Sequence, residues 1–336
     1  MKLKKLNTGV YRTILCICGL FAFAAILLQC ASVKKMTQTA ELDAFILKQK
    51  TFSLQNKHQI KYIDTGISND VILLVHGVPT SSWMYRNLIS KLVEKGYRVI
   101  APDLLGYGQS DKPDGYDIYS PTAMAGYLNE LMNSLKVAQW TQLCHDAGSL
   151  WTLEMYNTFG ADKRITHLVM LNSIILKSGF NPPIKLQEGN KAKLYIKSYC
   201  VDGIKQNTIS MTIKNGLFNP ALCTKEMLAG YIAPTQGRLD YALYHFFTHT
   251  CDKDLTDYSE TLKQISSKKT IIWGAEDKIL SWEKQAEELT SLMQLNPENI
   301  FILPDAKHYL AEENADFIAE SIGKTHHQNV TPTKGY

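Results

Sequence analysis

The sequence predicts the α/β class, with a doubly wound, mostly parallel sheet and a helical segment inserted between two late strands. Continuous apolar runs, typical of strands buried on both faces, alternate with segments of helical spacing. The alternation is absent from residues 177–255, which are rich in Lys, Asn, Tyr and Phe. A chain of 336 residues, 45% of them hydrophobic, is long enough for one large domain with such an insertion.

The elements follow in order along the chain. Before the insertion we expect a β-hairpin at 51–54 and 58–66, strands at 71–77, 97–103, 140–146 and 165–173, and helices at 85–96, 121–136 and 149–159. After it we expect strands at 269–277 and 299–306 and helices at 281–293 and 311–323. The sheet domain then comprises residues 45–176 and 256–323. Residues 324–336 form a polar tail. The insertion joins two strands at their carboxyl ends, where open α/β sheets bind ligands, so we interpret it as a lid.

Residues 1–33 predict an export signal or a membrane anchor. Four Lys and Arg residues and no acids precede an uncharged, apolar run over 13–33. Uncleaved, the run is long enough to act as a single N-terminal helix across the membrane. Its end, LLQC at 27–30, is similar to a bacterial lipoprotein cleavage box, with Cys30 as the lipidation site and Gln29 as a departure from the usual small residue. Both alternatives predict an exported, membrane-anchored protein with its sheet domain outside the inner membrane.

Charge and cysteine spacing exclude two classes of partner. The leader alone accounts for the formal net charge of +4, and no basic stripe indicates a nucleic-acid partner. Cys144, Cys200, Cys223 and Cys251 show no C-x-x-C spacing, so we expect no zinc site and no other cofactor. Export would permit disulfides among the last three. The sequence leaves the oligomeric state open.

Asp146 is the first candidate for a reacting side chain. It ends a predicted buried strand and is followed by Ala147, Gly148 and Ser149, which allow a sharp turn into the next helix. A carboxylate at such a nucleophile elbow can attack carbon and form a covalent alkyl ester. The alternative is that Asp146 only caps the following helix. No G-x-S-x-G motif occurs, so a serine at the centre of the elbow is not expected.

Hydrolysis of such an ester needs a base to activate water and an acid to orient that base. His308 lies in the loop after the last predicted strand, and Asp277 lies just past the preceding one. We expect them to form a triad with Asp146. The strand end at 165–173 is the other possible place for the acid, but it carries Asn172, which cannot serve.

The turn HGVPTSSW at 76–83 is expected to complete the site. The backbone N–H groups of Val78 and Ala147 would form an oxyanion hole for hydrolysis of the ester. We interpret His76 and His145, which lie in these turns, as structural residues.

Five segments of the chain carry a family resemblance. HGVPTSSWMYRNLI, VIAPDLLGYGQSDKP, HDAG, WGAEDKIL and AKHYLAEENADF resemble the haloalkane dehalogenase and epoxide hydrolase branch of the α/β-hydrolase fold family. The resemblance covers most of residues 50–323 and is weakest across the insertion. It implies the α/β-hydrolase fold, an aspartate nucleophile and a small-molecule substrate.

Two residues depart from the dehalogenase pattern. Dehalogenases of this type usually carry Trp directly after the nucleophile to hold the departing halide, and this chain has Ala147 there. Some carry Asn after the HG pair, where this chain has Val78. None of the five tryptophans lies in the insertion, so none there can replace the donor. The resemblance therefore favours epoxide hydrolysis, with haloalkane dehalogenation as the alternative.

Epoxide hydrolases use lid tyrosines to protonate the epoxide oxygen as the ring opens. For one of these two lid tyrosines the resemblance points to Tyr244, or to Tyr241 as the second choice. For the other it points to Tyr195 or Tyr199. Packing within the lid is the alternative role for each. A non-catalytic lipoprotein that binds a small ligand or a partner is a third possibility, from a different class of function.

Overall fold

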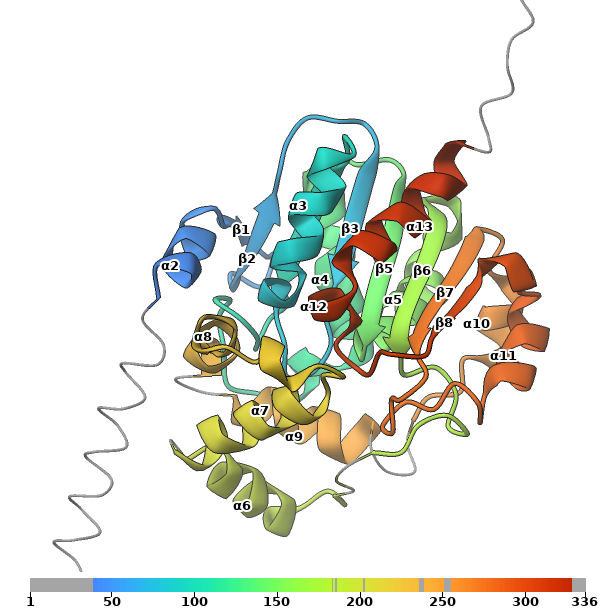
Figure 1. Cartoon of the computed structure of the whole chain (residues 1–336). Coiled ribbons are helices and arrows are strands. Elements are labelled where there is room, and N and C mark those ends of the chain that lie inside the picture. The colour runs from blue at the N-terminus through green and yellow to red at the C-terminus, as the bar shows by residue number, and fades with distance from the viewer. Residues whose placement is uncertain are drawn as a thin grey trace, which may run out of the picture.

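The computed structural model describes residues 39–182, 184, 186–201, 203–235, 239–250 and 255–327 (Figure 1). The predicted leader with Cys30, residue Cys251 and the end of the predicted tail lie outside these ranges. In the described part of the chain, no helix is both long enough and apolar enough to cross a membrane.

A single mixed sheet of eight strands forms the centre of the molecule, in the order β1-β2-β4-β3-β5-β6-β7-β8. The first two strands pair antiparallel, β2 pairs antiparallel with β4, and all the other pairs are parallel. The strands are β1 (Lys50–Ser53), β2 (Gln59–Asp64), β3 (Val71–Val75), β4 (Arg98–Asp103), β5 (Trp140–Asp146), β6 (Ile165–Ser173), β7 (Lys268–Gly274) and β8 (Ile300–Leu303). The predicted doubly wound, mostly parallel sheet is therefore confirmed. The strand order reverses between β3 and β5, and ligands bind at such a reversal in open α/β sheets.

Helices cover both faces of the sheet. In Figure 1, α3 (Arg86–Glu94), α12 (Leu310–Glu313) and α13 (Ala315–His327) lie in front of it, and α4 (Pro121–Ser134) and α5 (Gly148–Phe159) lie behind it. Successive side chains of β3 alternate between the two cores: Ile72 and Leu74 pack on the α3 and α13 side, and Leu73 and Val75 on the α4 and α5 side. A strand with this double burial must be apolar at every position, which explains its continuous apolar sequence.

The segment between β6 and β7 is helical, as expected. Figure 1 shows its first helices gathered at the end of the sheet toward which the β5 and β6 arrows point. α8 contacts the 3-10 turn at Ser82–Tyr85, and α9 contacts the one at Asp117–Tyr119. Action as a lid stays a prediction. The helices are α6 (Asn190–Tyr199), α7 (Ile204–Asn215), α8 (Lys225–Ile232), α9 (Asp240–His245), which continues as a π-turn over Phe246–Thr250, and α10 (Ser259–Gln264).

Several elements differ from the sequence prediction, since β7 and β8 end three residues before their expected ends and the last predicted helix is divided into α12 and α13. A short helix, α2 (Ala40–Leu47), precedes the hairpin. The helix expected at 281–293 begins only with α11 (Ala286–Met293), because Leu280 forms a bridge with Phe180 and the Ser281 N–H bonds to the carbonyl of Gly179. The last helix runs through the predicted boundary at Gly323 to the end of α13. Tertiary pairing, rather than local propensity, decides where α11 begins.

Candidate active site

Asp146 stands at a sharp turn between β5 and α5. Its backbone has φ +52°, a left-handed conformation that is uncommon for a residue other than glycine. A Cβ added to Gly148 would lie 2.5 Å from the carbonyl oxygen of Val75, and one added to Gly77 would lie 2.4 Å from the Asp146 carboxylate. Both positions require glycine because α5 and the turn after β3 approach the elbow this closely.

The two backbone groups predicted as an oxyanion hole are directed at Asp146. The N–H of Val78 donates to Oδ1 of Asp146 at 2.8 Å, and the backbone N–H of Ala147, beside the same carboxyl, lowers its pKa. Burial raises the pKa of the Asp146 carboxyl, and the charge on His308 and the two N–H groups only partly offset this effect. The elbow therefore holds a carboxylate that is poorly hydrated and supported by backbone donors.

The three residues of the predicted triad lie together. Nδ1 of His308 is 2.8 Å from Oδ2 of Asp277, and Nε2 of His308 is 3.9 Å from Oδ2 of Asp146. The other oxygen of Asp277 accepts the N–H groups of Ile279 and Leu280, at 2.9 and 3.1 Å. The imidazole thus donates a hydrogen bond to one carboxylate and turns its other nitrogen toward the elbow, which is the arrangement of a general base with its orienting acid.

The electrostatics of the pair support these roles. Burial raises the pKa of the Asp277 carboxyl, but His308, Asn172 and the backbone donors lower it by a larger amount. The net shift is therefore downward, and the carboxyl stays ionised. Burial alone would lower the pKa of His308, and the neighbouring Asp277 carboxylate outweighs it, so that this pKa is raised above its usual 6.5.

We expect hydrolysis of an ester on Asp146 to slow tenfold per pH unit in the acidic range, with a midpoint above pH 6.5. His308 accepts a proton only when it is neutral, and its pKa is raised mainly by Asp277, which stays charged while Asp146 is esterified. Single-turnover rates of ester breakdown between pH 5 and 9 measure this midpoint. A rate that stays constant well below pH 6.5 would exclude His308 as the base.

Asn172 has a role that the sequence analysis missed. Its side-chain amide donates to Oδ2 of Asp277 at 2.6 Å, and its amide oxygen accepts the N–H of Gly274 at 2.9 Å. Asn172 cannot itself serve as the acid, but it orients Asp277, which lies just beyond the end of the neighbouring strand β7. The signal for this role in the sequence was the amide of Asn172 at the end of β6, the strand that pairs with β7.

His76 and His145 bind backbone groups of the turns around the site. Nδ1 of His76 lies 2.8 Å from the carbonyl oxygen of Gly77, and its Nε2 accepts the N–H of Leu104 at 3.0 Å. Nε2 of His145 lies 2.9 Å from the carbonyl oxygen of His308. Burial lowers the pKa of His145 to about 3, so this ring is neutral. These are the structural roles that the sequence indicated.

Two of the tyrosines proposed for the lid make their contacts with Tyr116 and Gly189, not with the triad. Tyr241 and Tyr244 pack on Tyr116, with ring centroids 4.8 and 4.4 Å apart, and the Tyr244 hydroxyl accepts the N–H of Gly189. Tyr195 is 44% exposed on α6, and the side chain of Tyr199 lies outside the described residues. Ala242 and His245 lie on another face of α9 from these tyrosines. This face points toward the elbow, since both residues line a cavity together with Ala147.

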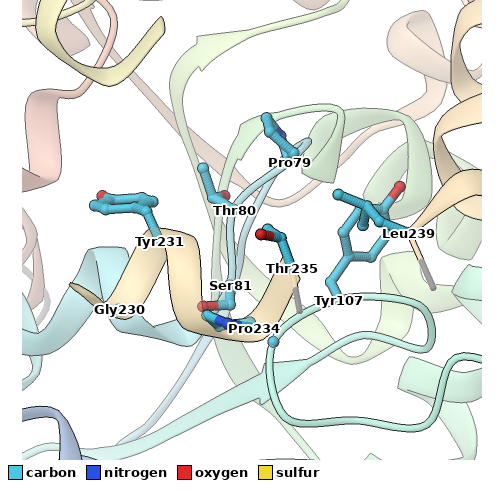
Figure 2. A pocket seen from close by; sticks show the side chains of 10 residues that line it. Pro79, Thr80, Ser81, Tyr107, Gly230, Tyr231, Pro234, Thr235 and Leu239 are labelled. Atoms are coloured by element: carbon cyan, nitrogen blue, oxygen red, sulfur yellow. The ribbon is translucent and has the colours of Figure 1, made fainter. Parts of the chain in front are cut away.

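Cavities lie on two sides of Tyr107, near the elbow. One, of about 10 Å³, is lined by Ala147, Trp151 and His245 among others, and a pocket of about 200 Å³ shares His245 with it. A second small cavity lies between Tyr107 and Leu239 on one side and Tyr231 on the other (Figure 2). Within the described residues, no group of three or more His, Cys, Asp or Glu side chains is arranged to hold a metal ion.

The elbow at Asp146, with Asp277 and His308 beyond the carboxyl ends of later strands, is the arrangement found in the α/β-hydrolase fold. The family model for the alpha/beta hydrolase fold matches residues 70–210, and the sheet with its flanking helices is that of the α/β-hydrolase fold. The structure of epoxide hydrolase VrEH1 from Vigna radiata is similar, with a TM-score of 0.63 and 21% identity over 83% of this chain and 97% of that one.

Two curated relatives match part of the chain. A haloalkane dehalogenase from Mycobacterium marinum is 36% identical over 118 residues, which are 35% of this chain and 39% of the relative. A cis-3-alkyl-4-alkyloxetan-2-one decarboxylase from Shewanella oneidensis is 36% identical over 135 residues, which are 39% of this chain and 41% of the relative. The chain thus spans about two fifths of the length of these relatives.

Proposed function

We propose that this protein is a hydrolase that opens a small apolar electrophile, in the manner of an epoxide hydrolase, through an ester on Asp146. The observation that supports this most directly is His308, held 2.8 Å from Asp277 and facing Asp146 at 3.9 Å. An aspartate that served only as a helix cap would need neither a base nor an acid beside it. The intact triad also argues against a protein that only binds a ligand.

The reaction would proceed in two steps. An oxygen of Asp146 attacks the electrophilic carbon, a C–O ester bond forms, and the bond to the leaving atom breaks with its electron pair on that atom. His308 then takes a proton from water, and the hydroxide attacks the carbonyl carbon of the ester. The N–H groups of Val78 and Ala147 stabilise the oxyanion, and as the intermediate collapses the leaving alkoxide takes the proton from His308 and departs as the alcohol.

The surroundings favour a small, uncharged substrate. The pocket of about 200 Å³, which shares Leu150 and His245 with the small cavity beside Ala147, is lined by apolar side chains together with Ser, Thr, Tyr and His, and no Asp, Glu, Lys or Arg lines it. We place epoxides first, because Ala147 removes the usual halide donor, and haloalkanes second, because the M. marinum relative is named a haloalkane dehalogenase.

A substrate panel tests the proposal. Protein without its leader is incubated with terminal and internal epoxides, with chloro- and bromoalkanes and with oxetan-2-ones, and released diol, halide or carbon dioxide is measured. Diol formation supports the epoxide assignment, and halide release alone would replace it with dehalogenation. No turnover and no adduct on Asp146 with any of these substrates would favour a binding protein.

The proposal includes export and anchoring at the membrane, which rest on residues 1–33 alone. A lipidated Cys30 would carry several acyl chains, and dual acylation is already enough for stable attachment. Mass spectrometry of the mature N-terminus is expected to find a lipidated chain that begins at Cys30, and Cys30→Ser should stay uncleaved. An uncleaved leader in both proteins would favour the single-helix anchor, and a soluble protein with intact Met1 would contradict both.

A further inference from the structure

Two side chains that carry hydrogen-bond donors, Tyr107 and Trp151, line the cavity beside Ala147. They are 2% and 4% exposed. Among the described residues, neither the Tyr107 hydroxyl nor the Trp151 indole N–H forms a hydrogen bond. Neither donor atom is among the fully buried atoms that lack a partner in the described part of the chain, so both remain open to a water or a ligand atom.

Five other buried aromatic residues of this chain pair their donor with an oxygen atom of the protein. The indole N–H groups of Trp83, Trp140 and Trp273 each donate to an oxygen atom. The hydroxyls of Tyr85 and Tyr231 likewise donate to an oxygen atom. Tyr107 and Trp151 differ from these residues in having no protein partner for their donors, and both line one cavity, where an acceptor atom could pair with them.

The two donors are held rigidly. The rings of Tyr107 and Trp151 have centroids 6.0 Å apart, and each packs edge-on against His76, at 5.5 and 5.9 Å. His76 is itself held by the Gly77 carbonyl and the Leu104 N–H. Donors fixed in this way need no reorganisation when charge develops on a neighbouring atom.

The size and polarity of the cavity define what it can hold. Its volume is about 10 Å³, which admits roughly one water-sized group. Much of the remaining wall is apolar, with Leu150, Ala242 and Phe246. His245 also lines it, but burial and the neighbouring His249 lower the pKa of His245 to about 4, so that its ring is neutral. The cavity suits a single acceptor atom better than a phosphate or a carboxylate.

We propose that Tyr107 and Trp151 form the subsite for the atom that leaves the carbon attacked by Asp146. The cavity adjoins Ala147, the residue directly after Asp146, and the Asp146 charge acts on Tyr107. As the bond breaks, the O–H and the N–H donate to the departing atom. A ring oxygen takes the Tyr107 proton, and the proton released when the ester is hydrolysed restores it. A halide accepts both hydrogen bonds and leaves as an ion.

This subsite rests on the proposed function and takes over the part that the sequence had assigned to Tyr241 or Tyr244, which face Tyr116. Because the leaving atom has departed before water attacks, the subsite affects only the first step. Ester formation and ester hydrolysis therefore respond differently to its loss.

Rapid-quench measurement of the adduct on Asp146 tests the subsite with Tyr107→Phe, Trp151→Phe and the double variant. We expect ester formation to slow by about 10²–10³-fold in each single variant, while the hydrolysis rate of the ester is unchanged. With an epoxide, ester formation should be slower in Tyr107→Phe than in Trp151→Phe, because the proton for the ring oxygen is lost. With a bromoalkane, the two single variants should form the ester at similar rates. Tyr156→Phe is the matched control, since its buried hydroxyl on α5 pairs with Ser267 away from the cavity.

Three other outcomes would count against the inference. Ester formation at the wild-type rate in both variants would refute the subsite and leave the proposed function standing. An equal slowing of both steps would show general damage to the site, and would also refute it. Wild-type protein that forms no ester with any electrophile would overturn the proposed function and the subsite together.

Discussion

Asp146→Asn is expected to lower turnover by about 10⁴-fold or more, because the neutral amide cannot attack carbon and removes the first step entirely. The fold should be retained, since the amide has the same shape and its oxygen can still accept the N–H of Val78. Initial rates on freshly prepared protein measure the effect. Fresh protein is needed because slow deamidation of the new Asn would regenerate the nucleophile.

Ser149→Ala is the control for this assignment. The Ser149 hydroxyl is fully buried and lies 2.6 Å from the carbonyl oxygens of Asp146 and Ile174, so it serves the backbone of the elbow. We expect the variant to keep most of its activity, with a loss of stability of about 1 kcal/mol for the missing hydrogen bond. An inactive but folded Ser149→Ala protein, beside an active Asp146→Asn protein, would make the serine the nucleophile.

His308→Gln is expected to trap the ester on Asp146. Attack by the carboxylate needs no base, whereas attack by water does, so the first step proceeds and the second slows by about 10²–10⁴-fold. Intact-mass spectra after incubation with substrate should show stoichiometric addition of the substrate. Peptide mapping should then place the added mass on the peptide that contains Asp146.

A second buried histidine provides the comparison. His167 lies near the start of β6, at the opposite end of the sheet from the triad, and its Nε2 is 2.8 Å from the Thr270 hydroxyl. His167→Gln should show turnover without an accumulated adduct. An adduct mapped to any residue other than Asp146 in the His308 variant would disprove the two-step mechanism.

Much of the sheet and the triad could be predicted from the sequence, because the signals are local. A strand buried on both faces must be apolar throughout, and this pattern places β3, β5 and β6 to within two residues. The elbow likewise needs small residues around Asp146, as Gly77 and Gly148 confirm. Once these elements are in order, the carboxyl ends of parallel strands meet at one edge, which brings Asp277 and His308 to Asp146.

The sequence by itself thus determined the sheet and the three ends of strands that carry the triad, because burial imposes one pattern of residues on each strand. Only the tertiary structure decided which side chains surround the triad. Asn172 orients Asp277, Tyr241 and Tyr244 turn away toward Tyr116, and Tyr107 and Trp151 line the cavity beside Ala147. These contacts join residues far apart in the chain, and they depend on the rotation of each helix about its axis and on which strands are neighbours, which no local pattern encodes.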